Sequence, residues 1–143
     1  LLLFTHFGFG QADEEQEVEQ VIIDLFDAMR TSDAKALSLC FYENAILETV
    51  YIKDSVSKVH RSLAQEFING VTAEHKEVYN EVIKEYKIEI DGIMASVWAP
   101  YEFYLDDKFL HCGVNSIQLF KSNKGWKITY VIDTRRTEGC LEE

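Results

Sequence analysis

The sequence is poor in proline, cysteine and positive charge. Its 143 residues include one proline and three cysteines, and 14 basic side chains stand against 25 acidic ones, for a net charge of −11. A single proline excludes collagen-like and proline-rich linker chains. Three cysteines allow at most one disulfide, and Cys40 and Cys112 are expected as free thiols packed like small hydrophobes. The acidic excess argues against binding to nucleic acid, where Lys and Arg must neutralise phosphates, and against an anionic membrane surface.

Apolar side chains, in contrast, are plentiful. The chain is 47% hydrophobic and 13% aromatic, which rules out disorder along its whole length. A chain of this length forms one domain and buries about two-thirds of its unfolded surface. It has no internal repeat, low-complexity tract or linker.

The first twelve residues differ from the rest of the chain. They carry no formal charge, and Leu1 to Phe9 is a mostly apolar run, too short to span a bilayer, which takes about 20 residues. Gly10 and Ala12 are small residues where a signal peptidase cleaves, and an acidic stretch follows at once. Residues 1–12 are therefore interpreted as the remnant of an export signal and residues 13–143 as the domain, exported to the bacterial periplasm or secreted. The alternative is an apolar arm that packs on the domain or on a partner.

Helical periodicity predicts three helices. Apolar residues recur at helical spacing from Val18 to Met29, and Asp13 stands where a capping residue is expected. Asp54 is expected to open the third helix and Gly70 to end it. The predicted helices are 13–30, 34–40 and about 54–70.

The later part of the chain alternates apolar and polar residues, which predicts strands. Asp91-Gly92 and Asp106-Asp107 are turn signals, and Pro100 implies a bulge or a sheet edge. Helices followed by antiparallel strands predict an α+β fold, with three N-terminal helices packed on one face of a strongly curved antiparallel sheet. The predicted strands are 45–52, 81–90, 93–105, 108–121 and 126–135.

The turns set the register, and the register decides which side chains share a face. The turn at Asp106-Asp107 places Glu102 opposite His111, and the turn at 122–125 places Asn115 opposite Ile132. One face then combines apolar residues with a polar group inside an aromatic ring, the composition of a small-molecule pocket. The same register puts charged residues of the strand 81–90 on that face, so either a bulge near Pro100 exchanges the faces or both faces are buried. In the second case a second copy of the chain covers the outer face and forms a homodimer.

Glu102 with His111 is the sharpest candidate for chemistry. A carboxylate facing an imidazole fixes its tautomer and tunes both pKa values for general acid–base catalysis. Tyr104 and Asn115 are placed to donate hydrogen bonds to a developing oxyanion. The alternative is a salt bridge that only supports the strand register. The ligand-binding candidates on this face are Trp98, Tyr104, Asn115, Tyr130 and Arg136.

Arginines and an aspartate end the last predicted strand. Arg136 is expected on the pocket face near His111, where it would hold an anionic ligand, or else at a solvated strand end. Asp133 is expected to point away from the pocket and to pair with Arg135 on the outer face or at a subunit contact. The four histidines have no metal-ligand spacing, and dinucleotide, phosphate-loop and nucleophile-elbow motifs are absent, so we expect no metal and no cofactor.

The three helices and the long meander ending in Gly-Trp-Lys-Ile resemble the nuclear transport factor 2-like superfamily, the cone-shaped, cystatin-like fold of ketosteroid isomerase and polyketide cyclases. The resemblance covers about residues 14–136 and is carried by VIIDLFDAMRTSDAKALSLCFYENAIL and GVNSIQLFKSNKGWKITYVIDTRR. The second segment, with VWAPYEFYLDDKFLHCG, is similar to the exported bacterial subgroup labelled lumazine-binding. This fold hosts isomerases, dehydratases, ligand carriers and assembly modules, so the resemblance implies a pocket between helices and sheet rather than one activity.

Three functions remain open. The first is binding of a small, partly aromatic or polar organic ligand without catalysis. The second is an isomerase, cyclase or dehydratase that uses Glu102 and His111 as its acid–base pair. The third is a structural or protein-binding module whose cavity is filled by its own side chains, which a cavity below about 100–200 Å³ would favour.

Overall fold

The computed structural model describes residues 9–140, which form an open sheet of seven strands and three helices. The strand order is β2-β1-β7-β6-β5-β3, and β4 also pairs with β5. The pair β1–β7 is parallel, and the other pairs are antiparallel. The elements in chain order are α1 (Phe9–Arg30), α2 (Ala34–Cys40), β1 (Phe41–Lys53), β2 (Val56–Leu63), α3 (Ala64–Thr72), β3 (Tyr79–Ile83), β4 (Lys87–Asp91), β5 (Met94–Leu105), β6 (Lys108–Ser122) and β7 (Gly125–Thr134).

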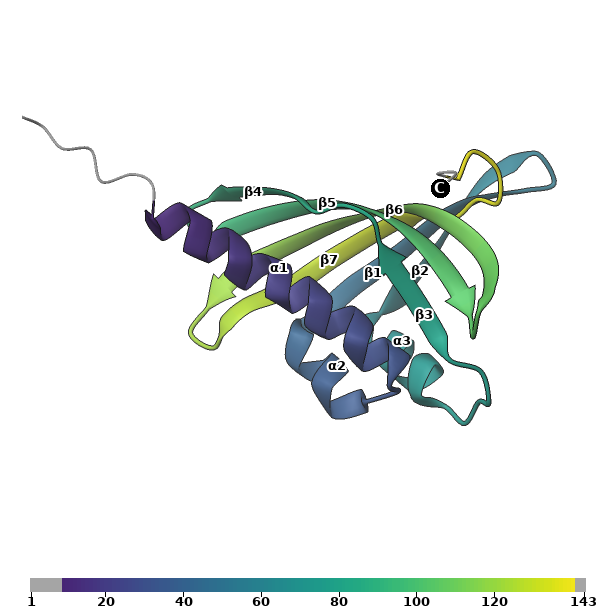
Figure 1. Ribbon diagram of the computed structural model, residues 1–143, viewed down its shortest axis with the longest axis horizontal. Helices are drawn as coiled ribbons and strands as arrows, with labels where there is room; N and C mark the ends of the chain where they lie inside the picture. Colours follow the sequence, from purple (N-terminus) through teal and green to yellow (C-terminus); the bar gives the residue numbers. More distant parts are fainter. Residues whose placement is uncertain (1–8, 141–143) are drawn as a thin grey trace, which may run out of the picture.

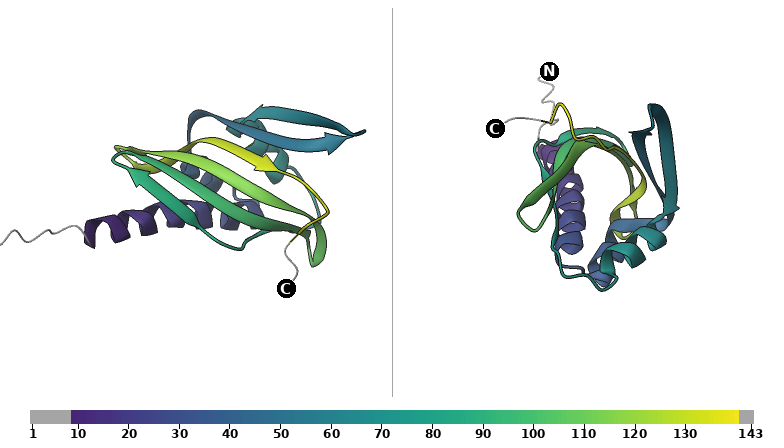
Figure 2. Two further views of the ribbon diagram at one scale, coloured as in Figure 1. Left: turned by 90° about the horizontal axis from the view of Figure 1, so that it is seen from above. Right: turned by 90° about the vertical axis from the view of Figure 1, so that its right-hand side faces the viewer.

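The sheet curves around α1, which lies across its concave side (Figure 1). The apolar stripe of α1 is buried, as its helical spacing predicts, with Val18 and Ile22 fully enclosed. These side chains join one core with Val97, Ile117 and Ile128 of the sheet. Helices α2 and α3 lie together at one end of the hollow (Figure 2).

Helix α1 begins before its predicted start. It starts at Phe9, so Asp13 lies within the helix instead of capping it. Residues 1–8 of the predicted export signal lie outside the described residues, and cleavage and export stay predictions. None of the described helices is both long and apolar enough to cross a membrane.

The predicted third helix was wrong over its first half. Asp54 and Ser55 have φ angles of 54° and 60°, the left-handed pair of a two-residue hairpin turn, and β2 pairs with β1 as an exposed antiparallel strand. Val56 and Val59 are exposed on this strand, so their helical spacing reflects no buried face. Helix α3 starts only at Ala64, after the hairpin is complete.

The predicted strand 81–90 is two short strands, β3 and β4, which pair with successive parts of β5. The break between them lies beside Pro100, whose carbonyl accepts a hydrogen bond from the Lys84 amide at 2.8 Å. Strand β5 itself continues through Pro100, which pairs with Val114. The sequence predicted a bulge or a sheet edge at Pro100. The irregularity is instead the break between β3 and β4, which pair with β5 on either side of Pro100.

Two β-bulges determine which side chains enter the hollow. Tyr104 pairs with Phe109, as the predicted turn requires, but Phe103 pairs with His111, so Leu110 is an extra residue in β6. In β7, Leu119 pairs with Ile128 but Gln118 pairs with Tyr130, so Thr129 is an extra residue. Each bulge shifts the register by one residue and therefore exchanges the faces of the strand beyond it.

A disulfide joins β6 to the segment that follows β7. Cys112 of β6 bonds to Cys140, which corrects the expectation that Cys112 is a free thiol. Cys40 is free and buried, and burial raises its pKa to about 11, which keeps the thiol protonated and unreactive.

Candidate functional site

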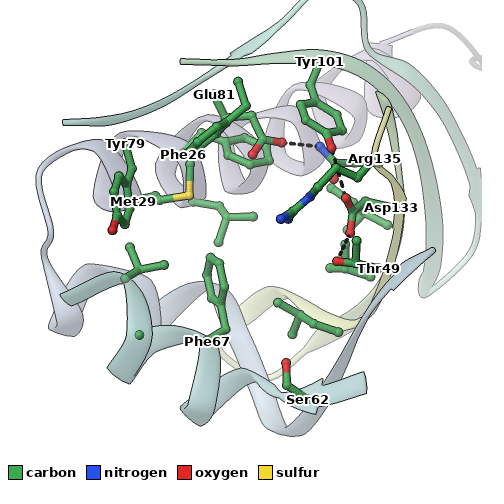
Figure 3. Close-up of a pocket in the computed structure, with 18 of the residues that line it drawn as sticks. Phe26, Met29, Thr49, Ser62, Phe67, Tyr79, Glu81, Tyr101, Asp133 and Arg135 are labelled. Carbon is green, nitrogen blue, oxygen red and sulfur yellow. Dashed lines mark hydrogen bonds between the residues drawn. The ribbon is translucent and has the colours of Figure 1, made fainter. Parts of the chain in front are cut away.

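A cavity of about 470 Å³ lies between α1, α3 and the curved sheet. Leu25, Phe26 and Met29 of α1 and Phe67 of α3 form an apolar wall (Figure 3). Polar side chains gather at the opposite side, on β1, β3, β5, β6 and the end of β7. The polar lining residues on this side are Thr49, Glu81, Tyr101, His111, Asn115, Asp133 and Arg135. The cavity is also lined by His60, Arg61 and Ser62 of β2 and by Glu66 of α3.

Asp133 is held by two hydroxyl donors. The Thr49 hydroxyl donates to Asp133 Oδ1 at 2.6 Å, and the Tyr101 hydroxyl donates to Asp133 Oδ2 at 3.1 Å and to the Thr134 carbonyl at 2.8 Å. Burial raises the pKa of Asp133, against the lowering effects of the Thr49 hydrogen bond and the Arg135 charge. Burial and the Asp133 charge also raise the pKa of Tyr101, which keeps its phenol protonated.

Glu81 is the second carboxyl group of the cavity. Asn115 Nδ2 donates to Glu81 Oε1 at 2.6 Å (Figure 3). Burial raises the pKa of Glu81 to about 8, and the Asp133 charge adds to this, whereas the Asn115 hydrogen bond and Arg135 oppose it. At neutral pH Glu81 is therefore mainly a neutral acid, able to donate a proton.

His111 supplies a neutral imidazole beside these acids. Its ring stacks on Phe103 with centroids 4.8 Å apart and meets the edge of Tyr101 at 5.9 Å. Burial, with a smaller contribution from the Arg135 charge, lowers the pKa of His111 to about 4. At neutral pH the imidazole is therefore uncharged.

Arg135 is the cation of the cluster, and its side chain extends into the cavity (Figure 3). Within residues 9–140, its guanidinium has no ion pair or hydrogen bond to a side chain. Arg135, Thr49 and His60 also line a second, more open hollow. These three residues thus mark where the cavity meets the outside.

The structure separates the predicted catalytic pair. His111 lines the cavity, but Glu102 lies on the outer face of the sheet. There its carboxylate forms an ion pair with Lys84 Nζ at 2.8 Å and accepts a hydrogen bond from the Tyr104 hydroxyl at 2.8 Å. The hydrogen bonds from Lys84 and Tyr104 lower the pKa of Glu102. The predicted pairing was wrong because the Leu110 bulge places Phe103, not Glu102, opposite His111.

Most predicted ligand-binding residues also lie outside the cavity. Trp98 is 53% exposed on the outer face with Tyr104, and the Tyr130 hydroxyl donates to Glu48. The Arg136 guanidinium contacts Cys112 Sγ at 3.2 Å and the Glu138 carbonyl at 2.8 Å, outside the cavity. Of these predicted residues, the cavity contains only Asn115.

Tyr101, Asp133 and Arg135 were missed for the same reason. The Thr129 bulge turns Asp133 inward together with Arg135 and Val131, whereas the prediction placed Asp133 and Arg135 on the outer face. Tyr101 lies on β5, whose face depends on the Leu110 bulge. Glu81 belongs to the charged strand that the predicted register already placed on the pocket face, but it was not singled out there. The clearest sequence signal was the alternation of Asp133 with Arg135, two charges that share one strand face.

The site is suited to proton transfer and to recognition of a polar group. It brings together a neutral acid, a hydrogen-bonded carboxylate, a neutral imidazole and a guanidinium that has no side-chain partner within residues 9–140. Among residues 9–140, no group of three or more His, Cys, Asp or Glu side chains is placed to hold a metal ion.

No protein-family model matches the sequence, and no curated protein matches it significantly. Solved structures match its fold. A Mycobacterium tuberculosis protein of unknown function is 18% identical, with a TM-score of 0.75 over 92% of this chain and 78% of that one. A nuclear transport factor 2-like protein of unknown function from Shewanella baltica is 15% identical, with a TM-score of 0.69 over 92% of this chain and 100% of that one.

A third structure, from Streptomyces avermitilis, is provisionally named a dehydratase of the same family. It is 12% identical, with a TM-score of 0.68 over 88% of this chain and 98% of that one. Other neighbours are described as having the cystatin-like fold. None of these descriptions mentions lumazine, so that subgroup stays a prediction. The chain has the nuclear transport factor 2-like, cystatin-like α+β fold.

Proposed function

We propose that this domain binds a small organic molecule in the cavity, with its apolar body against Phe26, Met29 and Phe67 and its polar group toward Asp133. The observation that carries the proposal is a cavity of about 470 Å³ with one apolar wall and one polar side. This volume lies within the roughly 300–1,000 Å³ of small-molecule sites. It exceeds the volume at which a module filled by its own side chains would be favoured.

The division of the lining supports an orienting site. The polar groups hold one another through short hydrogen bonds, such as Thr49 to Asp133 at 2.6 Å and Asn115 to Glu81 at 2.6 Å. A ligand therefore meets acceptors and donors that are already positioned, which reduces the entropy lost on binding. The apolar wall supplies affinity by burying the ligand's hydrocarbon surface.

Native mass spectrometry of protein purified from its own host tests the binding. We expect a retained small molecule, which is lost in Leu47→Trp because this cavity-lining side chain would fill the space. Val50→Trp is the matched control, since Val50 is on the same strand but lines only an outer hollow. Equal ligand retention by both variants would contradict binding in this cavity.

Acid–base catalysis on the bound molecule is the second candidate, and it uses different residues from the predicted pair. Glu81 can give a proton at neutral pH, while Asp133 can take one. Loss of water from a substrate needs both events, which fits the provisional name of the Streptomyces avermitilis neighbour. At 12% identity that neighbour establishes only the fold.

Deuterium incorporation into the retained molecule, followed by mass spectrometry in heavy water, tests the catalytic candidate. We expect exchange at a carbon-bound hydrogen in the native protein and none in Asp133→Asn, which still binds the molecule. Glu102→Gln should exchange normally because Glu102 lies on the outer face. Unchanged exchange in Asp133→Asn would remove Asp133 as the base.

A further inference from the structure

We propose that the molecule bound in the cavity carries a carboxylate group, which is held by Arg135. This inference rests on the proposed binding function and adds the chemical class of the ligand. It depends on where Arg135 lies, on what surrounds it, and on the charge of the route that leads to it.

Arg135 is a cation placed for a partner that residues 9–140 do not supply. Its side chain extends into the cavity between Tyr101 and Asp133 (Figure 3). Among the described residues, no carboxylate oxygen lies within 4.0 Å of its guanidinium. The nearby Asp133 already has two hydroxyl donors, Thr49 and Tyr101, on its two oxygens.

The planar guanidinium matches a carboxylate in shape as well as in charge. Its paired N–H groups can bind both oxygens of a carboxylate at once, which makes such contacts stronger than neutral hydrogen bonds. Arg135 remains accessible at the mouth of the cavity, so it can meet the ligand without breaking an existing ion pair.

The charge of the cavity favours one negative charge over two. Two arginines line the cavity, and Arg61 is paired with Glu48. The charge of Arg135 contributes to the pKa values of Glu81, His111 and Asp133. Asp133 is a nearby acid, and a doubly charged ligand would leave uncompensated negative charge beside it. A monoanionic carboxylate is therefore favoured over a phosphate monoester.

The approach to Arg135 is also suited to an anion. Although the chain has a net charge of −11, no acidic side chain is found among the described residues that line the outer hollow shared by Arg135 and His60. That hollow contains Arg135, Arg136 and His60 together with neutral residues. The adjoining hollow, which Arg135 also lines, contains Glu138 together with Lys58 and Arg136. A basic entrance on an acidic protein directs anions toward itself and repels them elsewhere.

Matched pairs of small acids and their primary amides test the inference at pH 7. The probes are 2-naphthoate with 2-naphthamide, cinnamate with cinnamamide, and 4-phenylbutyrate with 4-phenylbutyramide, with binding detected by saturation-transfer NMR and Kd measured by calorimetry. Each pair shares its apolar body and differs in charge. We expect at least one acid to bind the native protein roughly 10- to 100-fold more tightly than its amide, the usual effect of a charged hydrogen bond.

Two variants assign the preference to Arg135. Arg135→Met keeps most of the side-chain length without charge and should remove the preference for acids. Lys58→Met is the matched control, because it removes one positive charge from a nearby outer hollow that does not belong to the cavity. A preference for acids that persists in Arg135→Met would overturn the role of Arg135. The ratio of acid affinity to amide affinity is also measured on the native protein, so the carboxylate is tested even if a variant fails to fold.

The outcomes separate this inference from the proposed function. Amides that bind as tightly as their acids would overturn the carboxylate and leave small-molecule binding intact. If no probe binds, the charge of the retained natural molecule decides, since a neutral molecule would overturn the inference. Absence of both probe binding and a retained molecule would overturn the proposed function itself.

Discussion

Glu81 should make the folded state less stable as pH rises, and Glu81→Gln should remove this effect. The pKa of Glu81 is about 8 in the folded protein against an ordinary value of 4.5. Between these values the folded state binds the proton more tightly than the unfolded state does. The contribution of Glu81 to the free energy of unfolding is therefore fully present below pH 4.5, is lost as pH rises toward 8, and changes no further above pH 8.

The size of the effect follows from the shift. A shift from 4.5 to about 8 corresponds to an upper limit of about 5 kcal/mol at pH 9, at about 1.4 kcal/mol per unit. Because Glu81 lines a cavity that water can enter, we expect about 2–3 kcal/mol. Glutamine is neutral at every pH and its carbonyl can still accept the Asn115 hydrogen bond, so the native contact is kept.

Urea denaturation followed by tryptophan fluorescence from pH 5 to pH 9 measures this difference. The free energy of unfolding of Glu81→Gln should exceed that of the native protein by an amount that grows with pH up to about 8. Glu89→Gln, which changes an exposed glutamate of β4, is the control and should keep the native pH dependence. Parallel profiles for the native protein and Glu81→Gln would refute the burial of this carboxyl.

Three further predictions address other parts of the structure. His111, with its pKa lowered to about 4, should destabilise the folded state as pH falls from 6.5 toward 4, because the unfolded state then gains the proton first. Thermal melts of His111→Phe should lack this loss of stability at acidic pH, and an unchanged loss would contradict the prediction. Gly113→Ala would place a Cβ 1.9 Å from the Thr134 carbonyl oxygen and should lower the free energy of unfolding, measured by urea denaturation, by more than ~3 kcal/mol. Gly70→Ala meets open space in α3 and should raise the free energy of unfolding by about 0.5–1 kcal/mol. Equal effects of the two variants would argue against the close approach of β6 and β7. Cys140→Ser should lower the free energy of unfolding by about 3.5 kcal/mol, because the disulfide closes a loop of 28 residues, and an unchanged urea midpoint would show that the bond contributes nothing.

The parts of the fold with strong local signals could be predicted from the sequence. The apolar stripe of α1 and the turn at Asp106-Asp107 specify their own structure over a few residues, and both occur where expected. Asp54-Ser55 was misinterpreted because aspartate and serine also begin helices, and the exposed β2 has no buried face to reveal its alternation. The fold class therefore followed from local patterns, while the β1–β2 hairpin did not.

The candidate site depended on register, which local patterns do not specify. Strand β7 has apolar residues on both faces, Val131 inward and Tyr130 and Ile132 outward, so hydrophobic alternation could not show which face is buried. The extra residue Thr129 determines which face of β7 lines the cavity, and a threonine side chain does not indicate a bulge. The cavity itself could be predicted from the fold, but its acids could not.

The two bulges also make the chemistry of the cavity depend on strand register. Leu110 and Thr129 are each one residue beyond what the ladder needs. If the ladder instead ran through Thr129 without a bulge, the register beyond it would slip by one residue and Ile132, not Asp133, would pair with Asn115 and face the cavity. Deletion of Thr129, in contrast, would leave Asp133 opposite Asn115, so the acids of the cavity depend on the register of the ladder and not on the bulge residue itself.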